Sequence, residues 1–379
     1  MKKAWVFGFL VMVLVPLSLA AVKVAETDPY FHYHYPDTTR YYYRLDNQRS
    51  QNDGITRNFE YEGLITGTSM VENTSASEAE KLFGVPFIKV CYEGGTFNEI
   101  NANLTVAARS HPELKYVIRG LDMDMFFDDK DQWRTDLGEY PWYLYDQNPL
   151  NDVAYLFNQD VLFSRIPTME KERKDPDFTG GITSFDAYSN WMGDGYSFGT
   201  HSVFYGGGLA ETERTVPVQL TQEEAERIRE NIRQNVTALA LQNPQITFYV
   251  FIAPYSAAWW QAMLAAGELE KRTDAERIVI EEILTCENIR LFSFNTFFDI
   301  TTNLNHFKDM NHYGEWINSL ILRCMRTEKG RLTSDNYEKY LAEEREFYEN
   351  YDYTLLLTQE DYEADGQAAE LTRELSEVF

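Results

Sequence analysis

From about residue 59 the sequence alternates short apolar runs with amphipathic helix patterns, and this alternation restricts the fold more than any other feature. The runs FEYEGLIT (59–66), VPFIKVCY (85–92), KYVIRGLDM (115–123), ITFYVFIAP (246–254) and IRLFSFN (289–295) have the pattern of buried strands. The segments between them have helical periodicity, and the helix over 221–242 opens with a capping box from Thr221 to Glu224. Buried strands separated by helices predict an α/β fold with three layers, α/β/α, around a mostly parallel sheet.

The N-terminus carries an export signal of one of two kinds. Lys2 and Lys3 precede an uncharged apolar run over residues 4–22. Its length suits a membrane anchor, whereas Pro16 and the small-x-small triplet at 18–20 suit a cleaved signal peptide. Both interpretations of residues 1–24 remain open. Either one predicts an extracytoplasmic protein of a bacterial envelope, secreted or anchored to the cell membrane by this segment.

Charge and cysteine content exclude some classes of protein. The chain has 60 acidic and 34 basic residues among 379, a formal net charge of −26, which argues against a nucleic-acid partner because phosphate binding needs clustered Lys and Arg. Cys91, Cys286 and Cys324 are odd in number and lack metal-ligand spacing, so they predict no disulfide framework. The apolar and aromatic content is sufficient for one large domain or two small ones.

The strand and helix series is interrupted between about residues 125 and 215 by aromatic, Gly-rich and Asp-rich sequence, such as SNWMGDGYSFGTHSVFYGGG. Loops of this length are commonly functional lids or binding surfaces, or else poorly ordered. We predict a main domain over 25–330 that contains this insertion. Residues 331–379 follow as an acidic, helical C-terminal extension.

Two segments far apart in the sequence carry candidate catalytic side chains. In NHFKDMNHYGEW (305–316), Asp309 and His312 lie three residues apart before an amphipathic helix. In GLITGTSM (63–70), Gly67 allows a sharp turn after a strand and places Ser69 in the expected first helical turn, where backbone amides favour an oxyanion. A serine after a strand is also a common N-cap or turn residue, and an aspartate near a helix start is favoured by the helix dipole.

The order of these segments resembles the SGNH (GDSL-like) hydrolase superfamily. GTSM matches its nucleophile block with Thr68 in the Asp position, and DMNH matches its late Asp-x-x-His block. The resemblance implies a flavodoxin-like sheet, with Ser69 as nucleophile, His312 as general base and Asp309 orienting the imidazole. It is nearest to the envelope-associated branch of acyltransferase-like proteins.

The resemblance also implies an oxyanion hole, for which the sequence offers an incomplete set of donors. CYEGGTF (91–97) supplies Gly94 or Gly95 after its strand, and the Ser69 amide is the other expected donor. The third block normally ends in an asparagine, but here the strand ends RGLDMDMFFDD. Asp122 or Asp124 cannot donate there unless protonated, so the third donor is missing or lies elsewhere.

Other candidate binding residues have simpler interpretations. His32 and His34 form a His-x-His pair without a nearby third ligand, and DMDMFFDDKD lacks the Gly and terminal Glu of a calcium loop, so we predict no metal and no cofactor. Tyr255, Trp259 and Trp260 follow a strand. Aromatic rings at such a position can stack on a sugar but more commonly pack in a core.

Together these features predict an extracytoplasmic serine esterase or O-acyltransferase that acts on acyl groups of a cell-envelope glycan through a Ser-His-Asp triad. The expected substrate is an acylated glycan or small acyl ester, and a membrane-bound O-acyltransferase is a possible partner. The alternative is a non-catalytic module of the same fold that binds an envelope glycan or such an acyltransferase.

Overall fold

The computed structural model describes residues 2–136, 140–146, 148–212, 216–362, 370–371 and 373–375. Its contacts divide the chain into two compact units. One unit contains residues 1–60 and 135–188, and the other contains residues 61–134 and 189–379. The predicted insertion over 125–215 is therefore shared between the units, and its residues 137–139, 147 and 213–215 lie outside the described residues.

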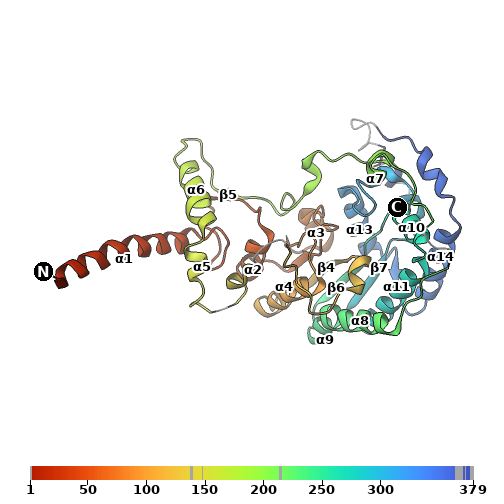
Figure 1. Ribbon diagram of the computed structural model, residues 1–379, viewed down its shortest axis with the longest axis horizontal. Helices are drawn as coiled ribbons and strands as arrows, with labels where there is room; N and C mark the ends of the chain where they lie inside the picture. Colours follow the sequence, from red (N-terminus) through yellow and green to blue (C-terminus); the bar gives the residue numbers. More distant parts are fainter. Residues whose placement is uncertain are drawn as a thin grey trace. The chain divides into compact units, whose positions relative to one another are not determined.

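The larger unit is built on a six-stranded sheet (Figure 1). Its strands are β2 (Gly63–Thr66), β3 (Phe87–Lys89), β4 (Tyr116–Leu121), β6 (Thr247–Ile252), β7 (Ile289–Ser293) and β8 (Arg331–Leu332). They are ordered β3-β2-β4-β6-β7-β8, and every pairing is parallel except β7 with β8. The five parallel strands thus have the doubly wound 2-1-3-4-5 order, as in flavodoxin, which confirms the predicted fold class.

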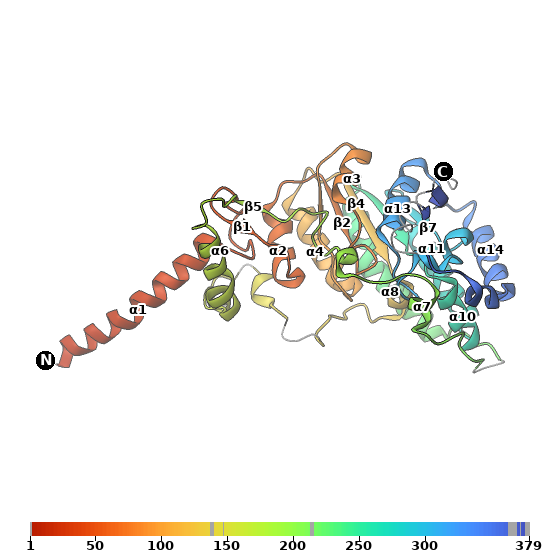
Figure 2. The same cartoon turned by 90° about the horizontal axis from the view of Figure 1, so that it is seen from above.

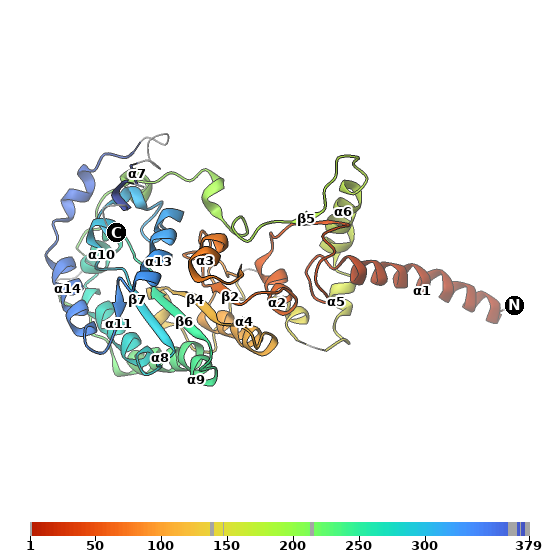
Figure 3. The same cartoon turned by 180° about the vertical axis from the view of Figure 1, so that it is seen from behind.

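Helices cover both faces of this sheet. α3 (Ala76–Phe83) packs with α13 (Glu315–Thr327), while α4 (Phe97–Ser110), α8 (Gln222–Ile232), α9 (Ala238–Gln242) and α11 (Leu269–Ile283) form the other layer (Figure 3). The unit also contains α7 (Thr200–Phe204), α10 (Ala257–Ala265), α12 (Phe298–Thr301) and α14 (Tyr337–Asn350). Short 3-10 segments complete it: η1 (Met123–Phe127), η4 (Trp191–Asp194), η6 (Leu304–His306) and η7 (Tyr353–Thr358).

Local sequence accounts for where these helices begin and end. Ser75 caps α3 by accepting from the Glu78 amide, and Gly84 ends it at φ 75°, a conformation that glycine adopts without a Cβ penalty. The predicted capping box at Thr221 is present. The single helix expected over 221–242 is instead divided by a π-helical segment, η5 (Arg233–Thr237). Both helical parts still bury apolar residues, Ile228 and Ile232 before η5 and Leu239 and Ala240 after it.

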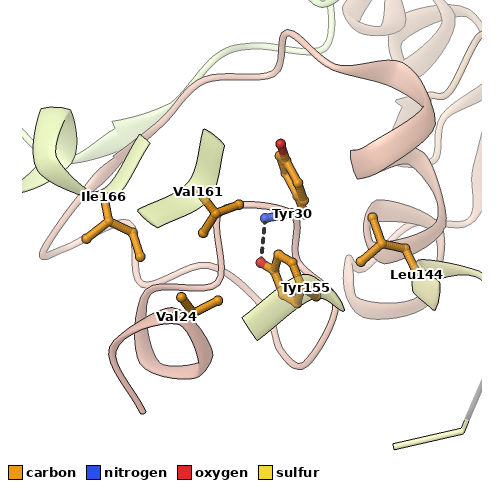
Figure 4. Close-up of a cluster of buried hydrophobic side chains, with 6 residues drawn as sticks. All are labelled: Val24, Tyr30, Leu144, Tyr155, Val161 and Ile166. Carbon is orange, nitrogen blue, oxygen red and sulfur yellow. Dashed lines mark hydrogen bonds between the residues drawn. The ribbon is translucent and has the colours of Figure 1, made fainter. Parts of the chain in front are cut away.

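The smaller unit combines α1 (Lys2–Thr27), α2 (Gln48–Asn58), η2 (Trp142–Leu144), α5 (Val153–Leu156), η3 (Val161–Arg165) and α6 (Ile166–Glu172) with the paired strands β1 (Tyr42–Tyr43) and β5 (Gly181–Ile182). Its core includes Val24, Tyr30 and Tyr155, which come from opposite ends of the unit's sequence (Figure 4). The Tyr30 amide donates to the Tyr155 hydroxyl at 3.1 Å, and that hydroxyl donates to buried Asp28 at 2.7 Å.

The N-terminal apolar run forms one continuous helix, α1 (Figure 2). Its part over Lys3–Thr27 is long and apolar enough to cross a membrane, with a mean hydropathy of 2.4 over its most apolar window, none of which is buried. A signal sequence has the same properties, so α1 is compatible with either kind of export segment. The last turn of α1 differs from the rest, because Val24 and Thr27 are buried in the smaller unit.

The predicted C-terminal extension begins with β8, which belongs to the sheet of the larger unit, and continues with the helices α14 and η7. α14 packs against α10 and α11, and Tyr348 on α14 stacks on Trp260 of α10 with ring centroids 4.4 Å apart. Residues 363–369, 372 and 376–379 of the predicted extension lie outside the described residues.

Candidate active site

Ser69 lies in a tight turn just beyond the carboxyl end of β2. Gly67 turns the chain at φ 153°, and a Cβ on this residue would lie 2.5 Å from Cγ2 of Val71. Both the backbone angle and the close approach therefore require glycine. The prediction that Ser69 occupies the first turn of a helix is wrong, because α3 begins only at Ala76.

Buried donors explain why the chain at Ser69 forms an irregular turn. The indole Nε1 of Trp191 donates to the Ser69 carbonyl at 3.3 Å, and the amide of Asn318 donates to the Met70 carbonyl at 3.1 Å. In a helix these carbonyl groups would accept from amides four residues later. Side chains from distant parts of the unit take that place here, so the helix dipole does not act on Ser69 in the way the sequence suggested.

Asp309 and His312 lie in a loop that ends just before α13. An isolated bridge pairs Phe307 with Tyr313 at the two ends of this loop. Within it, the amides of Asn311 and His312 donate to Oδ1 of Asp309 at 2.9 and 2.8 Å. The loop is therefore folded around the Asp309 carboxylate.

The structure brings the three predicted triad residues together. Nε2 of His312 lies 2.8 Å from Oγ of Ser69, and Nδ1 lies 2.8 Å from Oδ2 of Asp309. Because an ionised carboxylate only accepts, Nδ1 carries the proton and Nε2 accepts from the Ser69 hydroxyl. Burial alone would raise the pKa of Asp309, but hydrogen bonds and the charge of His312 leave that pKa below its ordinary value. Asp309 is therefore held as the ionised partner of the imidazole.

The two predicted oxyanion glycines lie in the turn that follows β3. This turn is next to the turn that contains Ser69, because the Tyr92 amide donates to the Gly67 carbonyl at 2.9 Å. The Gly95 amide is used within the turn, where it donates to the Tyr92 carbonyl at 2.8 Å. Gly94 has a φ of 53°, and its carbonyl accepts from Arg134 at 2.6 Å. The prediction of an oxyanion donor thus rests on the amides of Gly94 and Ser69.

The two aspartates of the third block have different surroundings. Asp122 follows β4 directly, is buried, and accepts a hydrogen bond from the Thr68 hydroxyl. Asp124 forms an ion pair with Arg272 at 3.1 Å. Asp122 is therefore the aspartate that contacts the turn containing Ser69.

Sequence reasoning missed Trp191 as a residue of the site. Besides its bond to the Ser69 carbonyl, its ring lies edge-on to the His312 ring, with centroids 6.2 Å apart. Lys308 Nζ lies 4.3 Å from the centre of the Trp191 ring and 3.9 Å from that of Tyr196. The aromatic, Gly-rich run at 190–199 was the available signal, since it indicated a functional loop without indicating which residue meets the serine.

The other candidate residues have structural partners. Tyr255, Trp259 and Trp260 are buried, which supports core packing. In the smaller unit, His32 lies 3.3 Å from Asp152, and both ring nitrogens of His34 contact backbone carbonyls, at 2.8 and 2.9 Å. Among the described residues, no group of three or more His, Cys, Asp or Glu side chains is placed to hold a metal ion.

The larger unit is thus an α/β fold with a serine, a histidine and an aspartate in hydrogen-bonded sequence beyond its strand ends. No protein-family model matches the chain, and no curated protein matches it. One similar solved structure is a Streptococcus pneumonia protein described under the name platelet activating factor. It has 11% sequence identity and a TM-score of 0.36, and the match covers 77% of this chain and 90% of that chain. A likeness this distant assigns no activity, so we take the function from the geometry of the site.

Proposed function

We propose that the protein is a serine esterase or O-acyltransferase of the SGNH type, with Ser69 as nucleophile. The observation that carries this proposal is the 2.8 Å separation between Ser69 Oγ and His312 Nε2, with Asp309 on the opposite ring nitrogen. A serine hydroxyl is a weak nucleophile at neutral pH, and this arrangement supplies the base that it needs. The doubly wound fold supports the same function, because such sheets bind ligands beyond the carboxyl ends of their strands.

In the proposed reaction, Ser69 Oγ attacks the acyl carbonyl while His312 Nε2 takes the hydroxyl proton. The negative charge that develops on the carbonyl oxygen is stabilised by backbone amides, for which Ser69 and Gly94 are the candidates. The imidazolium then gives its proton to the departing alcohol, leaving an acyl-serine. Water or a sugar hydroxyl attacks this ester in turn, and the same base accepts the proton of the attacking group. Asp309 keeps the imidazole in the required tautomer throughout.

We further propose that the acyl group belongs to a glycan of the cell envelope and that the larger unit acts outside the cytoplasm. The export segment α1 supports the location. Half-exposed Tyr196, whose ring lies against Trp191, supports a sugar substrate, since an exposed aromatic ring beside a reactive group packs well against sugar rings. The negative charge of the chain disfavours anionic polymers only at long range, because salt screens it beyond roughly 8–10 Å.

A fluorophosphonate probe on the purified full chain in detergent tests the triad directly. We expect one covalent adduct, located on Ser69 by peptide mass spectrometry. Ser69→Ala and His312→Ala should each remove nearly all labelling and all turnover of a small acetyl ester, and the double variant should lose little more, because residues that act as one unit are not additive. Ser77→Ala is the matched control, since Ser77 is an exposed serine in the neighbouring helix.

The alternative is a non-catalytic module that binds an envelope glycan or a membrane acyltransferase. It predicts neither labelling at Ser69 nor turnover of any acyl ester, with glycan binding unchanged in Ser69→Ala. That combination of results would replace the enzyme proposal. Labelling without glycan turnover would instead retain the serine chemistry and reject only the proposed acyl substrate.

A further inference from the structure

Asp122 is a buried acid in contact with the nucleophile turn, and the triad chemistry above does not use it. It lies directly after β4, and its residue surface is 6% exposed. Oδ2 accepts from the Thr68 hydroxyl, one residue before Ser69. Oδ1 is fully buried and has no hydrogen-bond partner among the described residues. Such a carboxyl must have a compensating interaction or it costs stability.

Among the described residues, His312 is the group whose positive charge, when the ring is protonated, favours the ionised form of Asp122. The charge of Asp124 acts against that form. Arg272 is paired with Asp124 and reduces that repulsion. The remaining titratable neighbours are Tyr255 and Tyr313, whose pKa values burial and the charge of Asp122 keep well above the ordinary value. Both phenols are therefore neutral.

The charges of Asp122 and His312 are consequently linked. Burial raises the pKa of Asp122 to about 6, while the Thr68 hydrogen bond and the charge of His312 oppose that rise. Linkage is reciprocal, so an ionised Asp122 must favour a charged imidazole to the same extent. In the proposed reaction the imidazole becomes charged when it takes the proton of Ser69. The Asp122 carboxylate would therefore stabilise the imidazolium at the step in which that charge forms.

We propose that Asp122 is a positioning residue of the site: its ionised carboxylate holds the nucleophile turn through Thr68 and stabilises the imidazolium form of His312. This proposal goes beyond the triad and, for its effect on rate, rests on the proposed function. The electrostatic part of the proposal does not rest on that function, because Asp122 and His312 are coupled whether or not the protein turns over an ester.

Asp122→Asn tests the charge while keeping the geometry, since the amide oxygen still accepts from the Thr68 hydroxyl. The titration midpoint of the His312 ring is measured by NMR on histidine-labelled full chain in detergent, with the signal assigned from His312→Gln. The midpoint should fall in this variant, because the negative charge that favours the protonated ring has been removed. The acid limb of kcat/KM should move by the same amount, and the maximal rate should fall.

Thr68→Val is the matched variant, because it removes the hydrogen bond and keeps the charge. We expect it to slow fluorophosphonate labelling of Ser69 and to lower the His312 midpoint less than Asp122→Asn does, because losing the hydrogen bond raises the pKa of Asp122 without removing its carboxyl group. Equal effects of Thr68→Val and Asp122→Asn on the midpoint would reduce Asp122 to a packing role. A higher rate in Asp122→Asn would also overturn the proposal, since it would show that a neutral side chain at this position serves the reaction better than a carboxylate.

The reciprocal measurement covers the case in which Asp122→Asn does not fold. In His312→Gln the midpoint of the Asp122 carboxyl, followed by carbon NMR, should rise, because the favourable charge of His312 has gone. An unchanged midpoint would refute the coupling. If the midpoints move as expected but no ester is hydrolysed, the coupling stands and the proposed function fails, so the two outcomes are distinguishable.

Discussion

Gly67→Ala tests whether the turn that contains Ser69 depends on a glycine at its start. The new Cβ would lie 2.5 Å from Cγ2 of Val71 and 3.4 Å from the Gly120 amide nitrogen of β4. Carbon atoms prefer separations of about 3.5–4.0 Å, so Val71 or the turn must move. Overpacking of this kind costs about 1–3 kcal/mol. The φ of 153° adds about 1–3 kcal/mol for a residue with a side chain.

The two costs can be separated with a matched glycine. Gly84 also has a positive φ, 75°, but a Cβ there would have no heavy atom within 4 Å. Gly84→Ala should therefore show the backbone cost alone, about 1–2 kcal/mol of unfolding free energy. Gly67→Ala should cost about 2–6 kcal/mol. The free energy of unfolding is measured by urea titration with tryptophan fluorescence, and the turn is assayed by the rate of fluorophosphonate labelling at Ser69.

A double-mutant cycle with Val71→Ala isolates the steric part. Removing the methyl groups of Val71 should make Gly67→Ala less costly by at least about 1 kcal/mol, which is a favourable coupling between residues in contact. Labelling of Ser69 should recover in part. The reasoning is refuted if Gly67→Ala costs no more than Gly84→Ala, or if the coupling with Val71→Ala is zero.

Three further predictions concern the site and the buried acids. Trp191→Phe, which removes the indole donor to the Ser69 carbonyl, should cost about 1 kcal/mol of unfolding free energy and slow probe labelling several-fold; equal rates would show that the bond does not hold the turn. Asp309→Asn should cut ester turnover by about 10⁴-fold in protein that urea titration shows to be folded, because the imidazole is held in the wrong tautomer; a loss below tenfold would contradict its role. Burial raises the pKa of both Glu276 and Glu344 above the ordinary 4.5, so the folded state binds more protons than the unfolded one and stability should fall as pH rises from about 4.5. Glu276→Gln should flatten that fall in urea titrations from pH 5 to 9, and an unchanged slope would refute it.

Much of the larger unit could be predicted because each element carries its own local signal. The parallel strands are mostly apolar runs, as expected for strands covered on both faces. Ser75 and Gly84 mark the two ends of α3, and the capping box at Thr221 marks the start of α8. Asp309 and His312 could be paired from sequence because both lie in one short loop, so their contact needs no knowledge of the tertiary fold.

The division of the chain into units could not be predicted in the same way. Composition made residues 125–215 one insertion, yet residues 135–188 belong to the smaller unit and residues 189–212 to the larger one. The contact between Tyr155 and Tyr30 that anchors residues 135–188 joins positions 125 residues apart. Tertiary packing determines which residues meet at such separations, and the periodicity of the sequence does not predict these contacts.

The conformation of Ser69 shows where local reasoning ends within the site itself. A glycine turn after a strand, followed by a polar run, is compatible with a helix that starts at the serine or several residues later. What decides between them is the supply of buried donors for the turn carbonyls, and these come from Trp191 and Asn318, more than 100 residues away in sequence. The same donors tie the nucleophile to α13 and to the aromatic run. Substitutions in those two segments should therefore affect the reactivity of Ser69, although neither segment supplies a group of the triad.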